Sequence, residues 1–143
     1  KLKQGNKMAI GKISEELKSA QDYLFNDATV TANATLTGSA NLVGGAQAAL
    51  EIVVNVGSTA IALANTKVLT ISLTGSDTEG GSFTDLQTLY TKTASGATTL
   101  AAGTELARYV VKPSDPLYVK AVAVNNDATL TGKIEAYIRY IAR

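Results

Sequence analysis

The chain has 143 residues, of which 45% are hydrophobic and 6% aromatic, so it can bury one core filled mainly by Val, Ile, Leu and Ala. It contains no His and no Cys, which excludes disulfides, thiolate chemistry and zinc or iron–sulfur sites built on Cys. Its formal net charge of +1 gives no reason to expect nucleic-acid binding, and no apolar run approaches the roughly 20 residues that cross a bilayer.

The charge is unevenly distributed along the chain. Residues 1–18 carry five lysines against Glu15 and Glu16, a balance of +3, so the rest of the chain is slightly acidic. We therefore expect a basic arm attached to a slightly acidic body.

The arm has one helical pattern. Four apolar residues recur at spacings of four, three and four: Ile13, Leu17, Ala20 and Leu24. Ser14 and the acidic pair that follows it suit a helix N-terminus. The pattern predicts a helix over Ser14–Phe25, ended by Asn26-Asp27. Such a helix would either plug one end of the body or dock on a neighbouring molecule.

Period-two alternation replaces the helical pattern after Asp27. Apolar and polar residues alternate in four segments: Thr29–Thr37, Leu50–Val56, Leu69–Leu73 and Lys133–Tyr140. Each segment predicts a half-buried strand. In the last segment, Ile138 and Tyr140 are expected to face inward, whereas Tyr137 and Arg139 are expected to face outward.

Three further segments are less regular. Leu86 and Leu89 have opposite parity within Asp85–Thr91, which indicates a bulge or a strand covered on both faces. Thr104–Lys112 mixes apolar and charged residues in both parities. Leu117–Val124 is apolar on nearly both faces, so this strand is either central or packed against a partner.

Turn residues separate these segments, and no linker divides them. Short pieces near Leu42 and Leu100 raise the expected count to eight or nine strands, and Pro113 and Pro116 mark a firm corner. Strands at this spacing predict an all-β sandwich or barrel.

Few residues suggest a metal site or a catalytic site. Asp77, Glu79 and Asp85 form the densest acidic cluster, and calcium takes oxygen ligands from such loops. The spacing matches no EF-hand, and a Gly-rich hairpin tip needs solvating groups, so we expect no metal and no cofactor. Without His, a general base would have to be Asp, Glu, Lys or Tyr, and we expect no enzyme.

One tyrosine suggests an interface. Tyr137 lies between Glu135 and Arg139 and is the best candidate for an exposed aromatic side chain. Tyr and Arg are enriched at the centres of protein interfaces. We therefore favour a subunit contact at this position over a glycan site.

Three stretches of the chain resemble a known family. They are Asp27–Thr35, Leu69–Asp77 with its continuation to Phe83, and Leu117–Val122 followed by Leu130–Ile138. Their order and spacing resemble the capsid cement, or decoration, proteins of tailed bacteriophages, in the group related to the Bordetella phage cement protein. The resemblance covers roughly Leu24 to Ile141, and the arm of Lys1–Asp22 is longer than the family pattern.

The resemblance implies an all-β jelly-roll sandwich of about eight strands on the outer surface of a phage head. Residues 1–26 would form the arm and residues 27–143 the jelly roll. The protein would be a homo-oligomer, with a dimer favoured over a trimer, and would staple major capsid proteins without binding nucleic acid or membrane. We expect its partner contacts at Leu17, Leu24, Tyr137 and Arg139.

Two other classes of function compete with this one. A jelly-roll module that binds carbohydrate or a host surface would need an exposed aromatic platform or a calcium loop. A jelly-roll enzyme such as a metal-dependent cupin would need His ligands, so it is the least favoured class.

Overall fold

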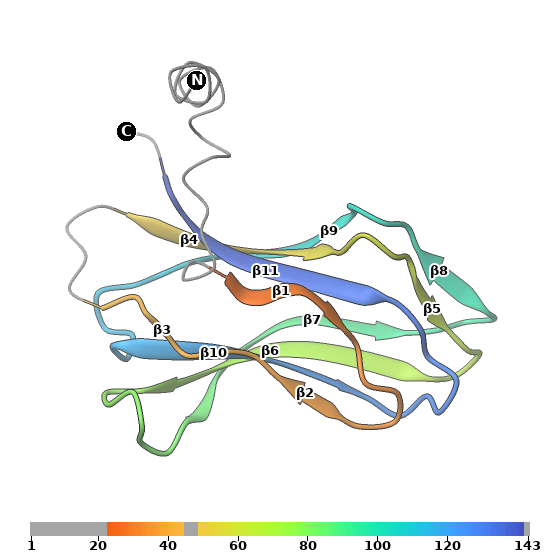
Figure 1. Cartoon of the computed structure of the whole chain (residues 1–143), viewed down its shortest axis with the longest axis horizontal. Coiled ribbons are helices and arrows are strands. Elements are labelled where there is room, and N and C mark those ends of the chain that lie inside the picture. Colours follow the sequence, from red (N-terminus) through yellow and green to blue (C-terminus); the bar gives the residue numbers. More distant parts are fainter. Residues whose placement is uncertain (1–22, 45–48, 142–143) are drawn as a thin grey trace, which may run out of the picture.

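The structure is a computed structural model that describes residues 23–44 and 49–141 (Figure 1). All the regular secondary structure in these residues is β-strand. There are eleven: β1 (Tyr23–Thr29), β2 (Thr35–Thr37), β3 (Asn41–Leu42), β4 (Leu50–Val56), β5 (Ile61–Leu63), β6 (Val68–Ser76), β7 (Thr84–Thr93), β8 (Thr98–Leu100), β9 (Glu105–Val110), β10 (Tyr118–Asn125) and β11 (Lys133–Tyr140).

The strands form a jelly roll. The first sheet has the order β1-β11-β4-β9, the second has the order β2-β10-β6-β7, and β5 pairs with β8 in a small third sheet. Because β2 and β3 both pair with β10, they act as one interrupted strand, and the two large sheets hold eight strand positions. Numbered along the chain, these positions run 1-8-3-6 and 2-7-4-5, which is the jelly-roll order. The prediction of a jelly-roll sandwich of about eight strands is confirmed.

One apolar core fills the space between the two large sheets. In β6, Leu69, Ile71 and Leu73 are fully buried, while the alternating residues are partly exposed. Alanines of β10 lie opposite these large side chains, with Ala121 across from Leu73 and Ala123 across from Ile71. The first sheet contributes Ile52, Val54, Val56, Ile134 and Ala136. The alternation predicted for β6 and the first half of β11 is therefore correct, whereas in β4 the predicted inward residues are buried but Glu51 and Val53 are buried as well.

The beginning of the sandwich differs from the sequence prediction. Tyr23–Phe25 were expected to end a helix, but they begin β1, and the rest of that predicted helix lies outside the described residues. Leu24 and Phe25 are both 2% exposed. Two adjacent side chains can be buried here because the pairing of β1 with β11 shifts register between Tyr23 and Phe25. Burial in the sandwich therefore overrides the helical spacing.

Thr29–Thr37 is not one strand, as was predicted. The chain turns at Ala32–Ala34, where Asn33 has a φ of 50°. The Asn33 N–H donates to Oδ1 of Asn125 at 2.9 Å and to the carbonyl of Asp127 at 3.1 Å. The two acceptors lie at the end of β10 and in the loop after it, far from Asn33 in the sequence, so a local pattern does not contain them.

The opposite parities of Leu86 and Leu89 have a clear cause. The register of β7 with β6 shifts twice, so that Leu89 is skipped between Tyr90 and Thr88, and Leu86 between Gln87 and Asp85. Both leucines pack against the core as the extra residues of two bulges. The bulge alternative is confirmed.

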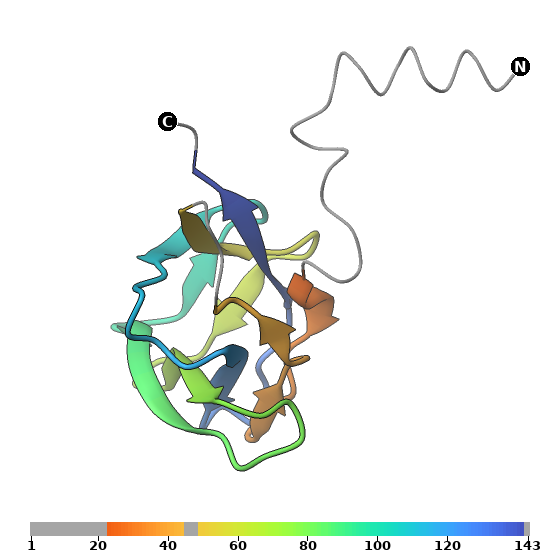
Figure 2. The same cartoon turned by 90° about the vertical axis from the view of Figure 1, so that its left-hand side faces the viewer.

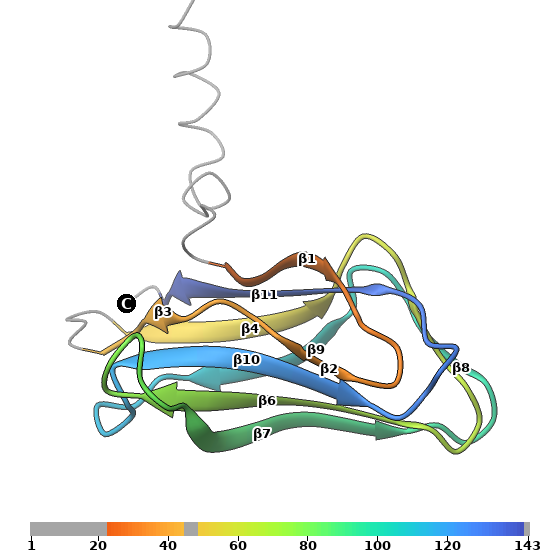
Figure 3. The same ribbon diagram turned by 60° about the horizontal axis from the view of Figure 1, so that its bottom comes forward.

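The sandwich has two distinct ends (Figures 1 and 3). At one end β4 and β10 begin and β9 and β11 finish, and we call it the arm end because β1, the first strand after residues 1–22, begins in the half of the sandwich nearer to it. Viewed from that end, the two large sheets lie as separate layers (Figure 2). The other end, called the far end, carries β5 and β8 and the loop between β10 and β11.

A buried carboxylate ties the far end together. Asp127, 1% exposed, accepts the Ala64 N–H at 2.7 Å and both the N–H and the hydroxyl of Thr129, at 2.8 and 2.7 Å. The neighbouring Asn125 donates to the Thr31 carbonyl at 2.7 Å. The bond from Ala64 and those from Thr129 hold the pKa of Asp127 below its ordinary value of 3.8. The end of β10 and the loop after it therefore fix the loops that contain Thr31 and Ala64.

The Asp127→Asn variant should be less stable at pH 7, because an amide nitrogen would face an N–H or O–H donor at one of these contacts. The stability that the carboxylate adds is fully present above its unfolded-state pKa of about 4 and is lost as pH falls through its lower folded-state pKa. Thermal unfolding monitored by circular dichroism should show that the variant melts several degrees below the parent protein at pH 7. This difference in melting temperature should narrow below about pH 4. Glu79→Gln, on the exposed loop after β6, is the control, and a difference that stays constant down to low pH would contradict this account.

Candidate interaction surface

Exposed apolar side chains gather at the arm end. Four of the five large hydrophobic residues with high exposure lie there, and we call them the arm-end patch: Leu42, Val110, Leu117 and Tyr140. Tyr140 is opposite Leu50 and Val110 is opposite Glu51, both at the start of β4. Leu42 is opposite Tyr118, at the start of β10. The register places Val110 on the outer face of the first sheet and Leu42 on that of the second, so these side chains surround the arm end, which is a candidate docking site.

The loops beneath the patch are held firmly. The Leu117 carbonyl accepts the N–H groups of Val43 and Gly44 at 2.7 and 3.0 Å. A side chain at Gly44 would collide with Leu117, so the glycine permits this close approach. The backbone at this part of the patch is therefore fixed by β3 and the start of β10.

The predicted corner at Pro113 and Pro116 also contributes to this rigidity. Asp115 accepts the Lys112 N–H at 2.8 Å and the Tyr109 hydroxyl at 2.9 Å. Burial, together with this hydrogen bond to Asp115, raises the pKa of Tyr109 to about 12. The tyrosine therefore stays protonated and continues to donate to the corner.

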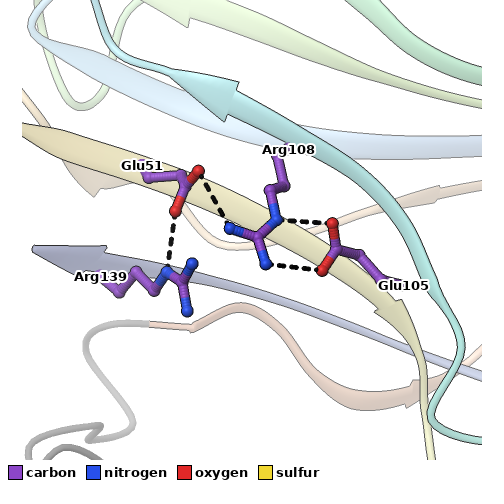
Figure 4. Close-up of polar contacts among 4 residues, drawn as sticks. All are labelled: Glu51, Glu105, Arg108 and Arg139. Atoms are coloured by element: carbon purple, nitrogen blue, oxygen red, sulfur yellow. Dashed lines mark hydrogen bonds and ion pairs between the residues drawn. The ribbon is translucent and has the colours of Figure 1, made fainter. Parts of the chain in front are cut away.

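An ion network crosses the outer face of the first sheet next to the patch (Figure 4). Glu51, on β4, accepts from Arg139 of β11 at 2.8 Å and from Arg108 of β9 at 3.5 Å. Arg108 also forms a two-bond pair with Glu105, at 2.6 and 3.0 Å. This hydrogen bonding holds the pKa of Glu105 below its usual range. The Glu51 side chain is only 10% exposed, so its charge requires these partners.

Arg139 is only partly engaged by the network. Its Nε donates to Glu51, whereas its two terminal nitrogens form no hydrogen bond among the described residues (Figure 4). The side chain is 42% exposed and is next in sequence to Tyr140 of the patch. A guanidinium held at one nitrogen can still form two parallel bonds to a carboxylate.

The expected contact residues are placed differently from one another. Arg139 is at the surface, whereas Leu24 packs inside its own sandwich. Tyr137 was expected to be exposed and is 7% exposed, whereas Tyr140 was expected inward and is 70% exposed. The expected exposure is therefore wrong for both tyrosines, although the register keeps Tyr137 in the parity of Val53 and Tyr140 in that of Leu50. Leu17 lies outside the described residues.

The tyrosine orientations have a physical reason. Tyr137 sits in the middle of the first sheet, opposite both Tyr23 of β1 and Val53 of β4. The Tyr23 ring meets it edge to face at 6.0 Å, so neighbouring strands cover it. Tyr140 is the last residue of β11, opposite the first residue of β4, at the very end of the first sheet.

The ion network was missed at the sequence level. Alternation places Glu51 and Arg139 on the outer face of their strands, but only the pairing of β4 with both β9 and β11 brings Arg108 and Arg139 to the same carboxylate. Strand order is a long-range property that a local pattern does not contain.

The acidic loop does not form a metal site among the described residues. No three acidic, His or Cys side chains there are grouped to hold a metal ion. Asp77 instead accepts the Leu117 N–H at 3.3 Å. In residues 23–44 and 49–141, no helix has the length and apolar character to span a membrane.

The strand order defines the protein as a jelly-roll β-sandwich, and the comparisons add no family. No family model matches the chain, and no curated protein sequence is similar to it. A chain of the T13 IBDV viral particle aligns with a TM-score of 0.40 and 12% identity over 83% of this chain and 30% of its own length. A chain of the infectious bursal disease virus VP2 subviral particle aligns with a TM-score of 0.42 and 11% identity, over 81% of this chain and 31% of its own length. This chain spans less than a third of each, and at these TM-scores neither alignment carries a functional argument.

The Arg139→Ala variant should lower the free energy of unfolding by about 1–2 kcal/mol, because it removes a charged hydrogen bond from the mostly buried Glu51. In a Glu51→Gln background the same substitution should cost less, since no buried carboxylate is left unpaired. Urea unfolding of the four proteins of this double-mutant cycle measures the coupling. Strictly additive effects would show that the network does not stabilise the sheet.

Proposed function

We propose that this chain is a structural virion protein that binds the outer surface of a tailed-phage head and cements contacts between major capsid proteins. The observation that supports it best is the arm end, where the exposed apolar side chains and Arg139 lie on a rigid sandwich. The resemblance of Leu69–Phe83 and Leu117–Ile138 to phage cement proteins points to the same role. The proposal assigns no catalytic step and needs no cofactor.

A cement role suits the physics of this fold. A DNA-filled head is under outward pressure, and an outer layer stabilises it by repeating one contact many times. Each contact can be weak because attachment at several points multiplies the affinity. A sandwich whose loops are fixed at both ends transmits load between those contacts without first having to become ordered.

The direct test is sedimentation of the purified protein with phage heads stripped of their outer layer, followed by heating. Saturable binding in fixed ratio to the major capsid protein, with heads surviving to a higher temperature, is the expected result. Binding to no mature head, combined with binding in a glycan screen, would favour the carbohydrate-binding alternative and contradict the proposal.

Val110→Asp should weaken head binding by about tenfold or more, because it buries a carboxylate in an apolar contact. Thr99→Asp is the matched control, since Thr99 is similar in shape and exposed on β8 at the far end. Co-sedimentation isotherms compare the two variants with the parent protein. If both bind as the parent does, the arm-end patch is not the docking site.

Deletion of residues 1–22 should also weaken head binding, because we expect the basic arm to become ordered on a neighbouring subunit and to contribute contacts there. A second variant with the five arm lysines replaced by Gln separates the effect of charge from that of length. Occupancy of heads is read by co-sedimentation at several salt concentrations. Full occupancy after the deletion would refute the role of the arm.

A further inference from the structure

The outer face of the second sheet has an unusual stripe. Alternate residues of β10 are buried in the core, so those between them point outward: Tyr118, Lys120, Val122 and Val124. Val124 is 43% exposed and is the one strongly exposed large hydrophobic residue of the described chain outside the arm-end patch. β10 is central, between β2 and β6, yet its outward residues are mostly apolar. This stripe is an unpartnered sheet face.

The register of the second sheet places two opposite charges on this face. Lys120 of β10 lies opposite Thr74 of β6, and Thr74 lies opposite Asp85 of β7. Residues directly opposite one another in antiparallel strands point to the same face. Lys120 and Asp85 therefore flank β6 at about 10 Å from each other, two strand spacings. Among the described residues neither side chain forms an ion pair.

Lys120 is held in place by an aromatic ring. The loop between β6 and β7 brings the Phe83 ring to 4.4 Å from Nζ of Lys120. A cation over a ring face is attracted to it and loses part of its freedom. The charge is therefore partly pre-positioned without being neutralised, which lowers the cost of ordering it in an interface.

We propose that a second copy of this chain packs on this face, with a two-fold axis lying in the interface parallel to β6. Rotation about that axis brings Lys120 of each copy over Asp85 of the other. The same rotation places Val122 opposite Thr88 and Val124 opposite Thr91 of the second copy, because these pairs flank Ser72 and Thr70 in the sheet register. On the axis, Thr70, Ser72 and Thr74 of β6 in one copy face the same residues in the other copy. Because these side chains are small, the two sheets can approach closely.

The charges select this axis over the alternative. A two-fold axis in the interface but perpendicular to the strands, at the level of Thr74, would place Lys120 against Lys120 and Asp85 against Asp85. Like charges in direct opposition are destabilising. With the axis parallel to the strands, both copies present their arm ends to the same side. The dimer is inferred from the second sheet alone and does not depend on the proposed head binding.

The first test is a charge exchange, measured by sedimentation equilibrium of the full chain over a wide concentration range. The parent protein should dimerise reversibly. Lys120→Asp and Asp85→Lys should each raise the dimer dissociation constant by about tenfold or more, since each change occurs twice in a two-fold interface. The double variant should recover most of the parent affinity, because the pair is restored with its signs reversed. Lack of recovery would contradict this pairing.

The second test uses two exposed valines on different surfaces. Val124→Asp should convert the dimer to a monomer, whereas Val110→Asp, with a similar exposure of 51%, should leave the dimer intact. Thermal unfolding of both variants confirms that they fold. A monomeric parent protein at all concentrations, or a dimer unaffected by Val124→Asp, would overturn the proposal. Head binding by Val110→Asp is measured separately, so failure of the cement role is distinguishable from failure of the dimer.

Discussion

Closure of one apolar core between two sheets is the constraint on which the rest of the structure depends. The last strand, β11, lies between β1 and β4, and β10 lies between β2 and β6, so each sheet forms only when distant parts of the chain meet. Ile134 of one sheet and Ile71 of the other are fully buried in that core. Burial of these side chains supplies the main driving force for bringing the strands together.

The two ends of the sandwich are stabilised in different ways. At the far end, Asp127 and Asn125 satisfy backbone groups of neighbouring loops, and this end is closed by hydrogen bonds within the chain. At the arm end, the loops are also fixed, but apolar side chains and the terminal nitrogens of Arg139 are left at the surface. The two ends therefore differ in their surface chemistry, and the arm end is the better candidate for docking.

Local patterns predicted the parts of the fold that depend on local burial. The inward residues of β4 and β6 followed from alternation because the inner faces of both strands are covered along their whole length, although the outer face of β4 is also largely buried. The turn at Asn33 could not be predicted locally, since its hydrogen-bond partner Asn125 is 92 residues away. Tyr137 and Tyr140 were assigned the wrong exposure because the cover from neighbouring strands, and not parity, decides it. Of the candidate site, Arg139 was found from sequence, whereas its link to Glu51 required the strand order.

The most direct test of the central claim is a cryo-electron microscopy reconstruction of stripped phage heads incubated with the protein. The account predicts sandwich-shaped density at fixed positions on the outer shell, with the arm end against the major capsid proteins and the strands steeply inclined to the surface. Heads without added density, or sandwiches attached by the far end that carries β5 and β8, would contradict it.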